Sequence, residues 1–447
     1  MATITLIGAG SVEFTQILLA DLSDFPELAG TTIALHDIDE QRLETAERIA
    51  RYVSDQTGAD FRIRAELDRR AALEGADFVV NEIQVGGFDA TLRDFDIPGH
   101  YGVRQTIGDT IGVGGVFRGL RTIPVLVAIA NDMLEVCPEA MLLNYANPMA
   151  MLPWAVWEGT ELPNAIGLCH SVQNTHEQLA EIVGVPVDEI DYTTAGLNHQ
   201  AFVLKFERGG EDLYPLLDAA IERDPEDLGR RVRIELYRSF GYFPTESSEH
   251  SAEYVPWFMR HDDQLERYRI PVSEYLRRSL ENLDEYDEVR RALIDGAPIP
   301  IEREGELAPR YIHSLVTGQA RIEYGNVRND GLLDDLPRGC CVEVPCRVDG
   351  DGVHPIAIGP LPPQCAALNR TFVNVAQLTM RAALEENRDH VYQAVMLDPN
   401  AGATLTIDAI RSMVDELIEA HGDLLPPGIR AGSSRPGGPR AAGVRRS

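Results

Sequence analysis

The stretch TITLIGAGS, residues 3–11, decides the fold that this sequence predicts. Its first five residues, Thr3–Ile7, form a short apolar run that is typical of a buried strand. Gly8 and Gly10 follow at once, and helical spacing of apolar residues begins at about Phe14. Strand, glycine turn and helix in this order predict a dinucleotide site, because glycines let the backbone approach a pyrophosphate at the amino terminus of the helix.

The second strand-like run, at 32–35, supports the same prediction. Two residues after it, Asp37 offers a carboxylate that can bind both ribose hydroxyls of a dinucleotide. Because an aspartate repels a 2′-phosphate, the pattern favours NAD over NADP. Glu13 stands at the third glycine position of GxGxxG, so a tight turn beside an ordinary surface aspartate is the alternative. The candidate cofactor-binding residues are Gly8, Gly10, Ser11, Asp37 and Asn81.

The remaining pattern predicts two domains and a tail. Apolar runs at 78–80 and 141–143 alternate with helical stretches such as 39–56, which predicts a Rossmann-type doubly wound parallel sheet over residues 1–195. Over 196–425 the pattern loosens into a second, α+β domain, in an architecture similar to lactate and malate dehydrogenases. Its expected helices cover 226–240, 272–283 and 373–386. Residues 426–447 contain many Pro, Gly and Ser and five arginines without an acid, so we expect a disordered tail.

Charge excludes some partners. The chain has 71 acidic and 40 basic residues, a net charge of -31, and one lysine, Lys205. This balance repels phosphate backbones and anionic membranes, so we expect neither nucleic-acid nor membrane binding. The sequence shows no signal peptide and no cysteine pairs of the CxxC type, so we expect a cytoplasmic protein with reduced thiols. The acidic surface also fits a cytoplasm at high salt, with a GC-rich genome as the alternative reason for the arginine preference.

Five strings of sequence carry a resemblance to a known family. They are NYANPMA (144–150), GLCHSVQ (167–173), AGLNHQAF (195–202), TESSEHSAEYVPWF (245–258) and EYGNVRNDG (323–331). Together they resemble glycoside hydrolase family 4, and the resemblance extends to about residue 425. The segment CHSV, 169–172, is similar to the α-galactosidase branch, whereas phospho-glucosidase branches have Asp or Asn after the cysteine. The resemblance implies an NAD-dependent hydrolase that acts on α-galactosides.

The resemblance implies a metal held by Cys169 and His199. Each residue follows an apparent strand, at 165–168 and 192–197 respectively, so both can face one crevice. A thiolate and a neutral imidazole suit borderline divalent ions. Spacing alone favours a buried thiol and a structural histidine, and the quoted strings reverse that preference. The family implies Mn²⁺, with the sugar O2 and O3 completing the coordination sphere.

The implied mechanism explains why a hydrolase needs NAD. Hydride leaves C3 of the sugar for NAD⁺, a base removes the C2 proton, and the glycosidic oxygen is eliminated. Water then adds at C1, and NADH reduces C3 again, so the usual pair of carboxylates is not required. We expect His170 to protonate the leaving oxygen and Tyr254 to be the base. A phenol titrates near pH 10, so a cation or the metal must lower its pKa, and a core tyrosine is the alternative.

Three residues are candidates for substrate binding. Asn147 lies in the loop after the run at 141–143, and its amide can bond two sugar hydroxyls. Asp109 and Arg118 lie in the glycine-rich segment GDTIGVGGVFRGL, which can close over a ligand, although a structural Ω-loop is the alternative. His250 is a further candidate near the metal.

Rival functions stay open at this point. An NAD-dependent 2-hydroxy acid dehydrogenase shares the amino-terminal design, and a non-catalytic NAD-sensing or scaffold protein is the second rival. Within the family, α-glucosidase and α-galacturonidase or α-glucuronidase activities compete with α-galactosidase. The resemblance implies a homo-oligomer, dimer or tetramer, with the residues of 196–425 serving substrate, metal and subunit contacts. The expected partner is a small-molecule glycoside.

Overall fold

A computed structural model describes residues 1–431, and its amino-terminal half forms a parallel sheet. The strands are β1 (Thr3–Ile7), β2 (Thr32–His36), β3 (Arg62–Glu66), β4 (Phe78–Asn81), β5 (Met141–Asn144) and β6 (Ala165–Gly167). They pair in the order β3-β2-β1-β4-β5-β6, and every pair is parallel. This is the Rossmann order, with its switch point between β1 and β4. The predicted fold class is confirmed.

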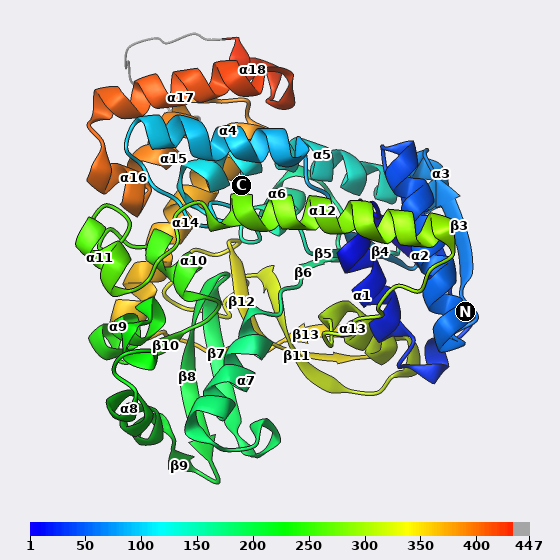
Figure 1. Cartoon of the computed structure of the whole chain (residues 1–447), viewed down its shortest axis with the longest axis horizontal. Coiled ribbons are helices and arrows are strands. Elements are labelled where there is room, and N and C mark those ends of the chain that lie inside the picture. The colour runs from blue at the N-terminus through cyan, green and yellow to red at the C-terminus, as the bar shows by residue number, and fades with distance from the viewer. Residues whose placement is uncertain (432–447) are drawn as a thin grey trace, which may run out of the picture.

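The second half extends the same sheet with antiparallel strands. These are β7 (Asp191–Leu197), β8 (Gln200–Arg208), β9 (Glu211–Asp212), β10 (Phe243–Pro244), β11 (Arg321–Arg328), β12 (Cys341–Asp349) and β13 (Gly352–Pro355). The order continues from β6 through β11, β12, β7 and β8 to β10, and β11 joins β6 where Asn326 pairs with Gly167. Figure 1 shows the β7–β8 hairpin projecting away from the parallel strands. The halves therefore share one sheet, and a division at residue 195 stays a prediction.

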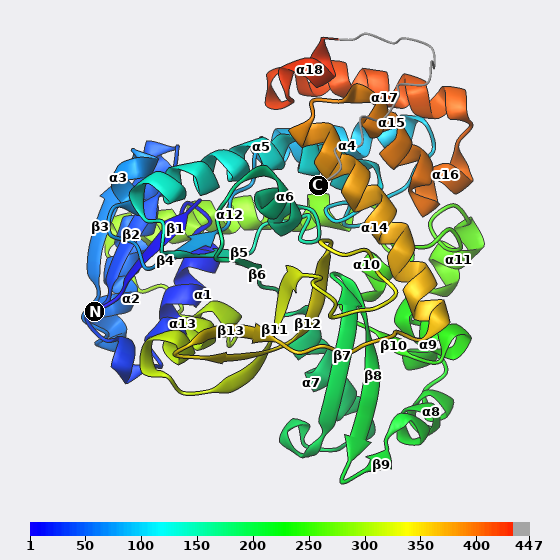
Figure 2. The same cartoon turned by 180° about the vertical axis from the view of Figure 1, so that it is seen from behind.

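Helices cover both sides of the sheet. In the first half they are α1 (Val12–Leu22), α2 (Glu40–Thr57), α3 (Arg69–Leu73), α4 (Gly87–His100), α5 (Gly112–Val136), α6 (Leu152–Gly159) and α7 (Ser171–Val183). In the second half they are α8 (Tyr214–Arg223), α9 (Val232–Phe240), α10 (Ser248–Glu253), α11 (Asp262–Arg267), α12 (Glu274–Asp295), α13 (Leu307–Thr317), α14 (Pro363–Leu384), α15 (Arg388–Leu397), α16 (Pro399–Thr404), α17 (Ile407–His421) and α18 (Pro427–Arg430). α12 crosses the front of the molecule in Figure 1, and α14 crosses the opposite side in Figure 2.

Some elements differ from the sequence-based expectation. β3 was not expected, because it alternates arginines with apolar residues at the sheet edge and none of its residues is fully buried. α12 was expected to end near 283 but continues to Asp295, past the residues whose apolar spacing predicted a helix. The expected tail begins differently, since 427–430 form α18 and Ile429 is fully buried. The rest of that prediction, 432–447, lies outside the described residues.

α5 is the apolar helix of the core. By length and composition it is the one helix within residues 1–431 that could cross a membrane, but 78% of its apolar window is buried inside the structure. Its first turn begins at Gly112, directly after the segment that contains Asp109. Burial in the core therefore accounts for the apolar composition of α5.

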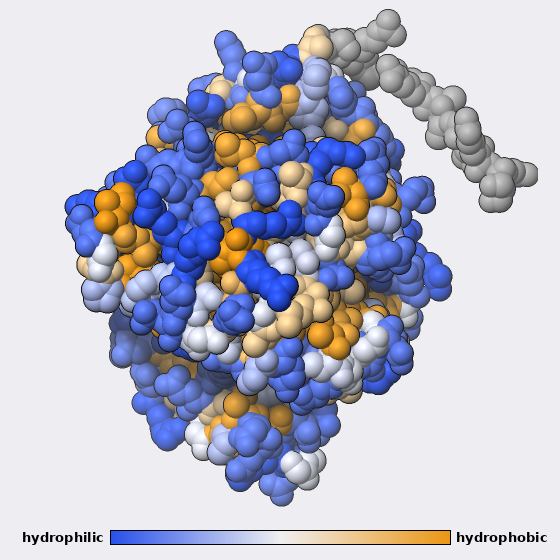
Figure 3. Space-filling model, turned by 90° about the vertical axis from the view of Figure 1, so that its right-hand side faces the viewer, coloured by the Kyte–Doolittle hydropathy of each residue, from blue (hydrophilic) through white to orange (hydrophobic). Residues whose placement is uncertain are grey.

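On the face of the molecule shown in Figure 3, hydrophilic residues predominate and apolar residues gather in separate patches.

Candidate active site

A cavity of about 940 Å³ lies at the carboxyl ends of the parallel strands. Gly8, Gly10, Ser11 and Asp37 line it from the sheet side. Gly8 has a φ of +92°, and a Cβ there would lie 3.0 Å from the backbone nitrogen of Ile83. A Cβ on Gly10 would lie 2.5 Å from Oδ2 of Asp37. Side chains at either position would fill the turn, so the cradle fits the pyrophosphate and ribose of a dinucleotide.

Asp37 is fixed in place by backbone donors. Its Oδ2 accepts from Gly10 N and its Oδ1 from Asp39 N, both at 2.9 Å. Each carboxylate oxygen has a second lone pair, so these bonds leave capacity for ribose hydroxyls. Asn81 is placed differently from the expectation, because it is fully buried, donates to Asn144 Oδ1 at 2.8 Å and does not line the cavity. Asn81 instead pairs in the sheet with Ile7, which lines the cavity.

Three donors of different chemistry converge beyond the sheet ends. Cys169 comes two residues after β6, His199 two residues after β7, and Glu246 just before α10. One ligand atom from each lies within 4.8 Å of the other two. Sulfur, nitrogen and oxygen donors together suit a borderline divalent ion, so these residues fit the expected metal. Glu246 was missed at the sequence level, although it belongs to the string that contains His250.

The surroundings of His199 favour its neutral form. Burial, together with the nearby His250, lowers the pKa of His199 to about 4, and a neutral imidazole is the form that binds metal. Its Nδ1 lies 2.8 Å from Thr110 Oγ1. Burial and the Glu246 carboxylate raise the pKa of the Cys169 thiol well above its usual value, so a cation is required to hold a thiolate there.

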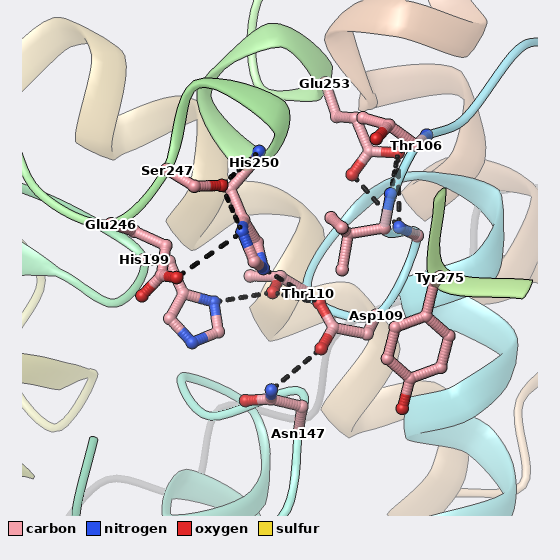
Figure 4. A network of polar contacts seen from close by, with 12 residues as sticks. Thr106, Asp109, Thr110, Asn147, His199, Glu246, Ser247, His250, Glu253 and Tyr275 are labelled. Atoms are coloured by element: carbon pink, nitrogen blue, oxygen red, sulfur yellow. Dashed lines mark hydrogen bonds and ion pairs between the residues drawn. The ribbon is translucent and has the colours of Figure 1, made fainter. Parts of the chain in front are cut away.

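A network of polar contacts connects the metal donors to the loop before α5 (Figure 4). Asp109 accepts from Thr110 Oγ1 and from Asn147 Nδ2, each at 2.8 Å, and lies 3.5 Å from Nε2 of His250. Burial alone would raise the pKa of Asp109, but the hydrogen bond and charge of His250 hold it well below its usual range. Asp109, His199 and His250 form a second set of donors within 4.8 Å of one another.

The three predicted substrate residues lie together. Arg118 donates from Nε to the Asn147 carbonyl at 3.3 Å and from Nη1 to the Tyr275 hydroxyl at 3.0 Å. Asn147 donates to Asp109, while its buried Oδ1 has no partner among the residues described. A buried amide oxygen without a partner is costly, so it is suited to accept from a ligand hydroxyl. This arrangement connects the cofactor cavity, which Tyr275 lines, with the metal donors.

Comparison with known proteins identifies the family. The family model described as family 4 glycosyl hydrolase matches residues 3–185, and the model of the family 4 C-terminal domain matches residues 194–401. The chain belongs to glycoside hydrolase family 4. An α-galactosidase of Bacillus subtilis (strain 168) is 42% identical over 430 residues, 95% of this chain and 99% of that protein. An α-galactosidase of Rhizobium meliloti (strain 1021) is 37% identical over 437 residues, 95% and 89% respectively.

The fold is also that of solved family 4 structures. The 6-phospho-β-glucosidase of Thermotoga maritima, in a structure with manganese, NAD⁺ and glucose-6-phosphate, matches with a TM-score of 0.79 at 22% identity, covering 95% of this chain and 99% of that one. At that identity the likeness establishes the fold alone. The predicted family is confirmed, and the chain is a glycoside hydrolase.

Tyr254, the expected base, is buried beside His199 in this family 4 enzyme. Its hydroxyl lies 3.5 Å from His199 Nδ1, its ring packs edge-on against Phe372, and it is 2% exposed. Burial raises the pKa of Tyr254 well above 10, opposite to the expected direction. A hydrogen bond with Thr110 lowers this pKa, but burial and the nearby Asp109, Glu253 and Glu246 carboxylates raise it and outweigh that bond. Tyr275, with Arg118 against its hydroxyl, is a second tyrosine of the site.

His170 reaches the open side of the site. Its side chain is 43% exposed, and Nδ1 lies 3.4 Å from Oε1 of the buried Glu306. The hydrogen bond to Glu306 raises the pKa of His170 to about 9. Glu306 stands at the amino-terminal cap of α13, far from the quoted strings, and nothing in the sequence pointed to it. The structure thus places a carboxylate behind the predicted acid.

Glu253 anchors the loop that carries Asp109. It is 4% exposed, and its carboxylate accepts from the backbone N–H groups of Thr106, Ile107 and Gly108. Three successive donors on one carboxylate fix the loop conformation immediately before Asp109. Figure 4 shows this contact beside the Asp109 network. The string TESSEHSAEYVPWF therefore supplies a loop anchor as well as candidate site residues.

Proposed function

We propose that this family 4 enzyme is an NAD- and Mn²⁺-dependent α-galactosidase. The proposal rests on a chain of contacts that connects the dinucleotide cavity to the metal donors. Tyr275 lines the cavity and contacts Arg118, and Arg118 contacts Asn147. Asn147 in turn donates a hydrogen bond to Asp109, which lies beside the metal donors. A sugar held at Asn147 would therefore lie between cofactor and metal. The two relatives named α-galactosidase, at 42% and 37% identity, support the choice of sugar.

The chain has residues suited to bind both NAD and Mn²⁺. The glycine cradle fits a dinucleotide, and Cys169, His199 and Glu246 are the donors that would hold the metal. When bound, NAD⁺ supplies a hydride acceptor and Mn²⁺ a Lewis acid, which together make the sugar C2 proton acidic. Neither group is consumed, so sugar release is expected to be redox-neutral overall.

Three side chains would orient the sugar, remove its C2 proton and protonate the leaving oxygen. The unpartnered Oδ1 of Asn147 accepts from a sugar hydroxyl and orients the ring. Tyr254, 3.5 Å from His199, would take the C2 proton, with a metal held at His199 opposing the rise that burial gives its pKa. His170, beside Cys169 and backed by Glu306, gives a proton to the leaving oxygen. General acid and base action of this kind contributes about 10²- to 10⁴-fold each.

We also propose a cytoplasmic homo-oligomer. The six cysteines are free, and five of them are buried, which suits a reducing compartment. The oligomer is implied by the family resemblance, and light scattering of the full chain would measure it. A small-molecule glycoside is the partner that we propose, and the relatives named α-galactosidase support it.

The test is release of p-nitrophenol from α-galactoside, α-glucoside and α-galacturonide substrates, with NAD⁺, Mn²⁺ and a thiol reductant added or withheld. The expected result is hydrolysis of the α-galactoside that requires all three additions and accumulates no NADH. A preference for another sugar would move the enzyme to that family 4 specificity. Steady NADH production from a 2-hydroxy acid, without glycoside cleavage, would overturn the proposal in favour of a dehydrogenase.

A further inference from the structure

α12 forms the outer wall of the cofactor cavity. It crosses the front of the molecule next to α1, α2 and α4 (Figure 1), and its residues Tyr275, Arg278, Ser279 and Asn282 line the cavity. Of its 22 residues, only Tyr286 is buried. The carboxyl-terminal half of α12 packs on the hydrophobic core through Tyr286, Val289 and Leu293, whereas its amino-terminal half is held across the cavity by side-chain contacts.

Those contacts reach the dinucleotide motif itself. Asn282 Nδ2 donates to Glu13 Oε2 at 2.7 Å, and Glu13 is the residue at the third glycine position of GxGxxG. Farther along, the Arg42 guanidinium lies 4.5 Å from the centre of the Tyr286 ring, and the Tyr286 hydroxyl lies 3.3 Å from Thr45 Oγ1. The departure from the glycine motif thus provides a contact that ties α12 to the first turn of α1.

Two of the three arginines that line the cavity are already engaged. Arg42 donates from Nη1 to the Gly10 carbonyl at 3.0 Å and stacks on Tyr286. Arg69 forms an ion pair with Asp132. Neither guanidinium is free to turn toward a ligand without losing these contacts.

Arg278 is the third arginine, and its terminal nitrogens are free. Its Nε donates to Glu274 Oε1 at 3.0 Å, and within residues 1–431 neither Nη has a hydrogen-bond partner. The same cavity is lined by four acids, Glu13, Asp37, Asp39 and Glu82. A pyrophosphate with two negative charges would lie near these acids in a chain of net charge -31, so a nearby cation would favour its binding.

We propose that Arg278 binds the pyrophosphate of the dinucleotide, with α12 as a clamp that closes the cavity from outside the Rossmann motif. Glu274 holds Nε, which would leave the two Nη groups to donate to phosphate oxygens in the forked geometry that guanidinium offers. Ser279, the next cavity residue on α12, already donates its hydroxyl to the Tyr275 carbonyl at 2.7 Å, so the phosphate contact is assigned to Arg278 alone. This inference rests on the proposed NAD dependence.

The test is calorimetric titration of the full chain with NAD⁺, comparing wild type, Arg278→Ala and Arg277→Ala. Arg277 is the matched control, because it lies on the same helix, pairs with Glu274 and Glu281 and does not line the cavity. Arg278→Ala is expected to weaken NAD⁺ binding about tenfold or more, and Arg277→Ala to change it by less than about twofold. Adenosine, which has no phosphate, should bind wild type and Arg278→Ala equally.

The outcomes separate the inference from the proposed function. If wild type binds NAD⁺ and Arg278→Ala binds it equally well, the pyrophosphate role of Arg278 is overturned while NAD dependence stands. An equal loss of adenosine binding would also overturn it, because it would indicate general damage to the cavity. If wild type binds no NAD⁺ at all, the proposed function and this inference fail together. Coincident thermal unfolding curves for the three proteins establish that each is folded.

Discussion

Among single residues, His199 lies beside both the loop before α5 and the other two candidate metal ligands. Its imidazole is neutral at working pH, one nitrogen lies against Thr110, and its ligand atom lies within 4.8 Å of both Cys169 and Glu246. His250, its neighbour at 4.7 Å between ring centres, has its pKa raised to about 9. Burial alone would lower that pKa, but the Asp109 and Glu246 carboxylates outweigh burial. Burial thus favours the neutral form of His199, whereas the two carboxylates favour the charged form of the adjacent His250.

Replacing Cys169 tests the metal site. A serine hydroxyl is a weak ligand where a thiolate is a strong one, so Cys169→Ser should weaken Mn²⁺ binding by roughly 100-fold or more and remove activity. Electron paramagnetic resonance of added Mn²⁺ measures the free ion. Cys137→Ser, at the end of α5 and away from the site, is the control and should bind Mn²⁺ as wild type does. Unchanged affinity in Cys169→Ser would remove Cys169 from the site.

The two tyrosines of the site make different predictions for the base. Tyr254→Phe should lower kcat about 100-fold or more with little change in KM, because the lost hydroxyl acts only in proton transfer. Tyr275→Phe loses a contact with Arg118 and should mainly raise KM. Steady-state kinetics on the α-galactoside compares them. The reverse pattern would make Tyr275 the base and Tyr254 a support for His199.

At the scale of elements, buried carboxylates fix the loops that carry the site. Glu253 at the end of α10 holds the backbone of 106–108, and Asp398 caps α16 by accepting from Ala401 N at 2.7 Å. Asp398 is 1% exposed, and burial raises its pKa to about 7. Both groups stabilise backbone conformation at the cost of burying a carboxylate.

Asp398 predicts a pH dependence of stability. Because its folded-state pKa, about 7, exceeds its ordinary value of 3.8, the folded protein holds a proton that unfolding releases between these pH values. Its contribution to stability is therefore lost as pH rises from about 4 to about 7. Asp398→Asn keeps a capping oxygen but cannot titrate. Denaturation at several pH values should show wild type losing stability relative to Asp398→Asn as pH rises, and parallel profiles would contradict the assignment.

Sequence patterns predicted elements better than contacts between them. Apolar runs predicted β1 and the strands beside it, but β3 has too few apolar residues to be recognised. α12 extends past the residues whose apolar spacing predicted a helix. Cys169 and His199 were predicted from strings that resemble a family. Glu306 and Tyr275 were not, because each enters the site from a distant segment whose contact depends on tertiary packing. The role of Glu13 likewise appears only with Asn282 beside it.

At the scale of the whole molecule, charge is the dominant feature. A net charge of -31 with a single lysine makes self-repulsion large in dilute buffer and small when salt screens it. The melting temperature should therefore rise by more than about 5 °C between 0.1 M and 2 M KCl if the chain is adapted to high salt. NaCl at matched ionic strength is the control for a specific potassium effect. A melting temperature that does not change with KCl would contradict adaptation to high salt and favour a GC-rich genome as the reason for the arginine preference.

The arrangement of the molecule joins a dinucleotide fold to glycoside chemistry. The parallel strands support the cofactor cavity, the antiparallel extension carries His199, and α10 and α12 bring Glu253 and Tyr275 to the boundary between them. The reaction that we propose at this boundary requires no pair of carboxylates flanking the glycosidic bond. It requires instead that the C2 proton of the sugar be removed and later replaced.

Proton exchange at C2 tests this account most directly. The enzyme, supplied with NAD⁺, Mn²⁺ and reductant, cleaves an α-galactoside in D₂O, and the galactose is analysed by mass spectrometry and proton NMR. The account predicts one deuterium at C2 of the released sugar, because the proton taken from C2 is replaced from solvent. Galactose released with its original C2 hydrogen would contradict the elimination route and return the enzyme to direct hydrolysis.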